Sequence, residues 1–155
     1  MKYNILLIDD QYEDESIQDF ILNASLSNIK INAVGTHDEG MDLILNDVEN
    51  KYQAVILDAT GYKSIGESEL SNTGLRYSLK KLSEHRKTKL VPWFVFTGAS
   101  RNKNISEFSN DLELFQDDIK FGRKGQVYYI KVDDEEKLLE DIIFEIENLE
   151  KSQIQ

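Results

Sequence analysis

Residues 3–10 read YNILLIDD, an apolar segment typical of a buried β-strand that runs directly into two aspartates. Three later segments share this design, with a polar residue after the apolar run: QAVIL (53–57) before Asp58, WFVF (93–96) before Thr97 and VYYI (127–130) before Lys131. Packing alone does not require strands rich in β-branched and aromatic residues to end in a functional group four times. The repetition predicts one site assembled from the ends of several strands.

Segments with helical periodicity separate the apolar runs. Apolar residues recur with helical spacing over 17–24, 41–48, 75–82, 105–115 and 138–149. A short strand is predicted at 29–34, and the following Thr36-His37-Asp38-Glu39 has the form of a capping box that starts the second helix. The chain therefore reads as five βα units in sequence.

Strict alternation of apolar strands and helices predicts an α/β fold, a doubly wound five-stranded parallel sheet with helices on both faces. Right-handed crossovers leave few topologies, of which we expect the flavodoxin-like strand order 2-1-3-4-5. Ligands of such sheets bind beyond the carboxyl ends of strands 1 and 3, where the winding reverses. Those strands end in Asp9-Asp10 and Asp58, so the polar pattern and the fold rule indicate the same place.

The composition indicates one domain and limits its partners. The chain has 155 residues, 40% of them hydrophobic, which predicts a domain over 1–150 and a polar tail at 151–155. It has no cysteine, no apolar run of about 20 residues and no basic-then-apolar N-terminus, so we expect a cytoplasmic protein without a membrane partner. A net charge of -11 repels phosphate backbones and argues against nucleic-acid binding; Mg²⁺ or basic protein surfaces are better partners.

The polar residues at the strand ends have a common chemistry. Carboxylates brought within a few ångströms of one another need protons or a cation, and Mg²⁺ is typically held by one or two carboxylates plus phosphate oxygens. One carboxylate can act as the nucleophile in phosphoryl transfer, while a lysine and a threonine hydroxyl contact the phosphoryl oxygens. The sequence therefore predicts a magnesium-assisted phosphoryl site.

At these residues the chain resembles the receiver domains of two-component response regulators. The resemblance runs from about Lys2 to about Leu149 and rests on four segments in the expected order: ILLIDD, VILDAT, VPWFVFTGA and YYIKVDDEEKLLEDI. It implies that Asp58 is the phospho-acceptor, that Asp9 and Asp10 form the magnesium-binding acidic pair with Asp58, and that the backbone carbonyl of Thr60 is a further metal ligand.

The resemblance implies roles for four more residues and for the partners. Thr97 is the switch hydroxyl, Gly98 leaves room for the phosphoryl group, Lys131 is its lysine partner and Tyr128 is the switch aromatic. A histidine kinase or a phosphotransfer protein donates the phosphoryl group, and an unknown downstream effector responds. The domain is then no enzyme beyond catalysing its own aspartyl phosphorylation and dephosphorylation.

The chain departs from the family pattern in two respects. Val132 follows Lys131 where family members usually have a proline, often after a cis peptide bond. A cis bond before a non-proline residue costs about 3 kcal/mol, so we expect a trans peptide here. The segments 61–73 and 101–125, on either side of the proposed pocket, are longer than usual and have the length of functional or mobile loops.

Two other functional classes stay open at the sequence level. A pseudo-receiver, which keeps the fold as an unphosphorylated interaction module, is favoured by Val132 and the long loops and disfavoured by the intact acidic triad. A phosphatase resembling the haloacid dehalogenases could share the motifs at Asp58 to Gly61, at Thr97-Gly98, at Lys131 and at Asp133-Asp134. That family has its nucleophile on the first strand of its core domain, whereas here an acidic pair precedes Asp58 on another strand.

Each candidate residue also has a structural interpretation. Asp9 and Asp10 are common residue types where a strand gives way to a helix, and Thr97 could satisfy a turn hydrogen bond. Lys131 could be a solvated strand-end lysine, and Tyr128 fits core packing as well as a switch. His37 and His85 are interpreted as structural or exposed.

Overall fold

The computed structural model describes residues 2–59, 73–85, 87–88, 90–98 and 128–154. Five strands form one parallel sheet in the order β2-β1-β3-β4-β5. The strands are β1 (Tyr3–Ile8), β2 (Ile29–Val34), β3 (Ala54–Asp58), β4 (Trp93–Thr97) and β5 (Tyr129–Ile130). The helices are α1 (Glu15–Ser25), α2 (His37–Leu45), α3 (Thr73–Glu84) and α5 (Glu135–Ile154). The predicted fold class and strand order are confirmed, while the helix predicted at 105–115 lies outside the described residues.

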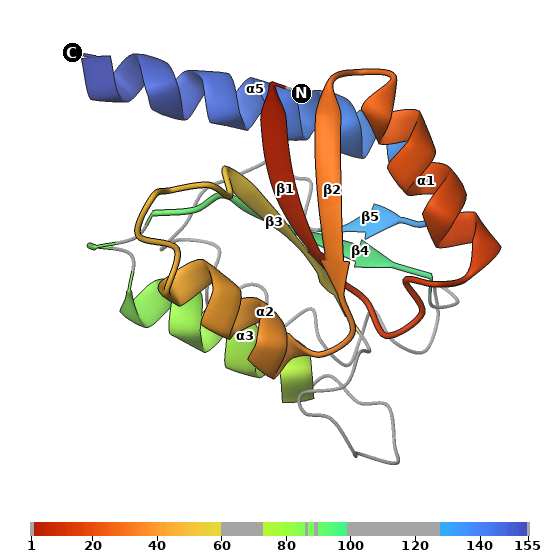
Figure 1. Cartoon of the computed structure of the whole chain (residues 1–155), viewed down its shortest axis with the longest axis horizontal. Helices are drawn as coiled ribbons and strands as arrows, with labels where there is room; N and C mark the ends of the chain where they lie inside the picture. Colours follow the sequence, from red (N-terminus) through yellow and green to blue (C-terminus); the bar gives the residue numbers. More distant parts are fainter. Residues whose placement is uncertain (1, 60–72, 86, 89, 99–127, 155) are drawn as a thin grey trace.

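Two hydrophobic cores cover the two faces of the sheet. Side chains alternate between faces along a strand, so Ile5 and Leu7 of β1 pack in one core while Leu6 and Ile8 pack in the other. The first core lies beneath α1 and α5, and the second lies beneath α2 and α3 (Figure 1). Because both faces are covered, the strands are apolar throughout, which explains the continuous runs in the sequence.

The strand register brings the carboxyl ends of the strands to one edge. Ile8 pairs with Leu57, Asp58 with Phe96, and Thr97 with Ile130. The residues that follow β1 and β5 therefore lie next to the last residues of β3 and β4. The sheet alone is enough to gather the polar strand-end residues.

The helix α2 begins at the predicted cap. The Thr36 side chain accepts a hydrogen bond from the Glu39 backbone N–H at 3.4 Å, and its hydroxyl donates to the Glu39 carboxylate at 2.9 Å. The helix ends at Leu45, and Val48, predicted to continue its apolar face, is 90% exposed. That part of the prediction is wrong, because the chain leaves the helix at Asn46 before Val48 can reach the core.

The C-terminal elements differ in length from the prediction. The strand predicted at 127–130 is limited to Tyr129–Ile130 in the described residues, and Tyr128 precedes it. The last helix continues through Ile154, into the segment predicted as a polar tail. No helix in the described part of the chain has the length and apolar content needed to span a membrane.

Candidate functional site at the carboxyl edge of the sheet

Three carboxylates form a cluster at this edge. Asp9 and Asp10 follow β1 and Asp58 ends β3, and each offers an oxygen within 4.8 Å of the others. Asp9 and Asp58 are buried, whereas Asp10 is partly exposed. The turn after β1 fixes Asp9, whose backbone N–H donates to Val34 O at 2.9 Å. Its Oδ1 accepts a hydrogen bond from the backbone N–H of Gln11 at 2.8 Å.

The Lys131 ammonium group reaches into this cluster. Its Nζ lies 2.7 Å from Asp9 Oδ2 and 3.4 Å from Asp58 Oδ1. Burial lowers the pKa of Lys131, but the charges of Asp58 and Asp9 outweigh burial and raise the pKa overall. The Lys131 backbone N–H donates a hydrogen bond to Thr97 O at 2.9 Å, which holds the lysine beside the end of β4 and next to the cluster. The lysine therefore stays charged and neutralises part of the acidic group.

Burial and the neighbouring carboxylates change the pKa of Asp58. Burial raises the pKa of Asp58 to about 7, and the charges of Asp9 and Asp10 add to this rise while Lys131 opposes it. A single ammonium group does not compensate three clustered carboxylates, one of them fully buried.

The cluster fits a hard divalent cation. Asp9 Oδ2 is buried and is paired with the Lys131 ammonium at 2.7 Å, but this one cation faces three carboxylates. The donor set consists of carboxylate oxygens, which Mg²⁺ prefers. Asp9, Asp10 and Asp58 are therefore the residues that could hold such an ion.

The other predicted site residues lie around this cluster or outside the described residues. Thr97 ends β4 beside Asp58 and is buried, and Tyr128 is half-buried against the α2–α3 core. A Cβ at Gly98 would lie 3.2 Å from Lys131 Cδ, so this glycine leaves room for the lysine stem. Thr60 and the segments 61–72 and 101–125 lie outside the described residues, whereas Thr73 begins α3.

One residue beside the site was interpreted from the sequence only as structural or exposed. His37, the first residue of α2, is fully buried. Its Nε2 lies 3.2 Å from the backbone carbonyl oxygen of Asp58, and its Nδ1 lies 2.6 Å from Ser78 Oγ. Burial lowers the pKa of His37 to about 4. The spacing to Met41 and Ile44, at i+4 and i+7, is the signal that could have placed it on the buried face.

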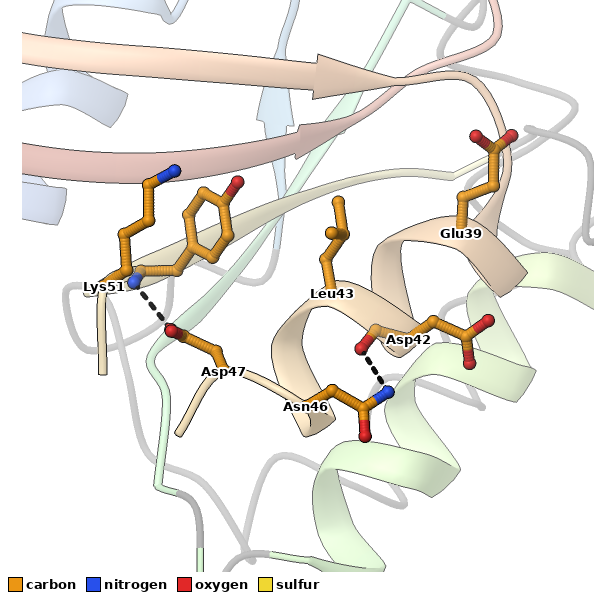
Figure 2. A pocket seen from close by; sticks show the side chains of 7 residues that line it. Glu39, Asp42, Leu43, Asn46, Asp47 and Lys51 are labelled. Atoms are coloured by element: carbon orange, nitrogen blue, oxygen red, sulfur yellow. Dashed lines mark hydrogen bonds between the residues drawn. The ribbon is translucent and has the colours of Figure 1, made fainter. Parts of the chain in front are cut away.

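A separate hollow of about 610 Å³ lies beside α2. Its lining residues are Glu39, Asp42, Leu43, Asn46, Asp47, Lys51 and Tyr52 (Figure 2). Two of its polar side chains make local hydrogen bonds. Asp47 Oδ2 accepts one from Tyr52 N at 2.8 Å, and Asn46 Nδ2 donates one to Asp42 O at 2.9 Å. The hollow shares no residue with the acidic cluster, so it is not part of the candidate site.

Solved structures that are similar to this chain include several receiver domains. A signal receiver domain from Vibrio parahaemolyticus aligns with a TM-score of 0.64 and 12% identity over 99% of this chain and 97% of its own. The receiver domain of Francisella response regulator 1452 aligns with a TM-score of 0.59 and 15% identity over 96% of this chain and 99% of its own. A two-component response regulator from Legionella pneumophila aligns with a TM-score of 0.55 and 19% identity over 95% of this chain and 99% of its own.

Sequence comparison finds no such likeness: no protein-family model matches the chain, and no curated protein matches it. The architecture is nevertheless specific. The sheet has the strand order 2-1-3-4-5, with an acidic cluster at the carboxyl ends of β1 and β3. The chain has the fold of a response-regulator receiver domain.

Proposed function

We propose that this protein is a phospho-accepting receiver of a two-component signalling system. Asp58 accepts the phosphoryl group with Mg²⁺, from a histidine kinase or a phosphotransfer protein, and the phosphorylated domain regulates a downstream effector. The observation that carries the proposal is the acidic cluster, whose three carboxylates offer oxygens within 4.8 Å of one another at the switch point of a receiver fold.

The transfer needs a nucleophile and compensation of charge. An Asp58 carboxylate oxygen forms a bond to phosphorus while the bond from phosphorus to the donor's histidine nitrogen breaks, and that nitrogen keeps the electron pair. A bound Mg²⁺ would neutralise the carboxylates and hold phosphoryl oxygens. Asp58 suits the nucleophilic role because its oxygen Oδ1 already faces a cation, Lys131 Nζ, at 3.4 Å.

Lys131 and Thr97 would respond to the new group. The Lys131 ammonium, now 2.7 Å from Asp9, is near enough to Asp58 to exchange its carboxylate contact for a phosphoryl oxygen. Thr97 lies on the neighbouring strand and would donate its hydroxyl to a second oxygen. Such inward contacts would move the carboxyl ends of β4 and β5, which is how the state of Asp58 would reach a partner.

Phosphorylation by a small donor tests this function. Acetyl phosphate with Mg²⁺ should add one phosphoryl group to the wild-type protein, measured as intact mass, and Asp58→Asn should add none. Asp42→Asn is the matched control, because it removes an exposed carboxylate from α2 and should leave phosphorylation unchanged. A modified Asp58→Asn protein, or an unmodified wild type, would contradict the proposal.

A pseudo-receiver is the second candidate. The observation that favours it is the ion pair between Lys131 and Asp9, the shorter of the two lysine contacts, which neutralises part of the cluster without a metal. Such a module would bind its partner equally well with and without Mg²⁺ and acetyl phosphate. The intact-mass experiment separates the two candidates, because only the receiver gains mass.

A further inference from the structure

His37 connects three elements at the phospho-acceptor. It begins α2, its Nδ1 lies 2.6 Å from Ser78 Oγ of α3, and its Nε2 lies 3.2 Å from the carbonyl oxygen of Asp58 in β3. His37 and Ser78 are both fully buried. The packing around the ring is tight: a Cβ at Gly74 would lie 2.5 Å from His37 Cδ2. The imidazole is therefore held in one place and one orientation.

The partners determine where the ring proton lies. The Asp58 carbonyl oxygen can only accept a hydrogen bond, so Nε2 must carry the proton and donate it. A neutral ring then has an acceptor at Nδ1, to which the Ser78 hydroxyl donates. This arrangement satisfies the buried carbonyl at the end of β3. An unsatisfied buried carbonyl would be free to turn its peptide towards another donor.

We propose, on the basis of the receiver function proposed above, that His37 is a positioning residue that orients the Asp58–Ala59 peptide for metal binding. The oxygen of this peptide accepts the hydrogen bond from His37 Nε2, and the chain continues into Ala59, which is fully buried. Rotation of this peptide would move the Asp58 side chain, which belongs to the carboxylate cluster. The loss of His37 therefore weakens Mg²⁺ binding.

Metal affinity distinguishes this role from a purely structural one. Hydrogen bonds that orient metal ligands typically contribute about 10- to 100-fold to metal affinity. His37→Leu removes both hydrogen bonds and should raise the Mg²⁺ dissociation constant by about that factor. His37→Gln keeps an N–H donor at the reach of Nε2 and should stay close to wild type. Ile44→Ala is the matched control, because it creates a cavity on the buried face of the same helix, about two turns from His37.

The experiment is an NMR titration of the full chain with MgCl₂, following the backbone amides of Asp9, Asp10 and Ala59. Melting temperatures of all variants show that each is folded under the conditions used. We expect weakened Mg²⁺ binding in His37→Leu, near-wild-type binding in His37→Gln, and unchanged binding in Ile44→Ala despite its lower melting temperature.

The contrary outcomes have separate meanings. If the wild type binds Mg²⁺ and His37→Leu binds it equally well, the positioning role is overturned while the receiver function stands. Equal weakening in Ile44→Ala and His37→Leu, or failure of His37→Gln to restore affinity, also overturns it. A wild type whose amides do not shift with Mg²⁺ overturns the receiver function and the positioning role together.

Discussion

At the scale of single residues, the ionisation of Asp58 would control the proposed phosphoryl transfer. A carboxyl group whose pKa is raised to about 7 by burial is partly protonated near neutral pH, and a protonated carboxyl is a poor nucleophile. A cation beside it favours the ionised form. In the proposed function, metal binding and the nucleophilic reactivity of Asp58 would therefore both depend on the charge around this carboxyl group.

This ionisation predicts a pH-dependent stability. Because the folded state keeps the Asp58 proton to a higher pH than the unfolded chain does, the stabilisation from Asp58 is fully present below about pH 3.8 and is lost as the pH rises through about 7. Asp58→Asn does not titrate. Its free energy of unfolding should therefore rise relative to wild type across this window, by an amount on the order of a few kcal/mol.

Denaturant unfolding of both proteins in a chelating buffer, at several pH values from about 4 to 8, measures this difference. The contribution of His37 to stability has the opposite pH dependence. Burial lowers the pKa of His37 to about 4, so its contribution is lost as the pH falls. That contribution is common to both proteins and cancels in the difference. A difference that does not change with pH would contradict the raised pKa of Asp58.

At the scale of elements, the turn between β5 and α5 positions Lys131. The Ile130 backbone N–H donates to Asp134 Oδ2 at 2.8 Å, and the Asp134 N–H donates to the Ile130 carbonyl at 2.8 Å. Within this tight turn Val132 has a φ of 74°, a left-handed conformation that is a genuine outlier for a β-branched residue. The expected trans peptide is confirmed, since no cis bond occurs among the described residues. A proline could not adopt this φ.

The left-handed Val132 predicts that glycine is better tolerated there. Val132 is 69% exposed, so Val132→Gly loses little packing and removes a backbone penalty of about 1–2 kcal/mol. Part of this gain is offset by the greater freedom of glycine in the unfolded chain, so we expect a rise of up to about 1 kcal/mol in the free energy of unfolding. Val48→Gly is the control, because Val48 is 90% exposed without a positive φ and should lose stability. Equal losses in both variants, measured by denaturant unfolding, would refute the strain.

At the scale of the whole molecule, the sheet and its site follow from short-range signals. The bounds of β2 and the apolar runs of β1, β3 and β4 were predictable, because strands buried on both faces are continuous apolar runs. The carboxylate cluster followed from strand order, since parallel strands end at one edge. The Thr36 cap was predictable from its local pattern.

Other features depend on tertiary contacts that the sequence does not display. The contacts of His37 with Asp58 and Ser78 join residues far apart in the chain, so periodicity could at most indicate burial. The φ of Val132 contradicts its own backbone preference and results from the closure of the turn before α5. The lack of space for a Cβ at Gly98, next to the Lys131 stem, depends equally on two neighbouring strands.

The most direct test of the receiver function locates the phosphoryl group on the chain. An aspartyl phosphate is reduced by borohydride to homoserine, which marks the modified residue in a peptide map. After treatment with acetyl phosphate and Mg²⁺, we predict homoserine at position 58 alone, because Asp58 combines burial at the end of β3 with the facing Lys131 ammonium at 3.4 Å. Homoserine at position 9 or 10, or none in a protein whose mass has increased, would contradict the assignment of Asp58 as phospho-acceptor.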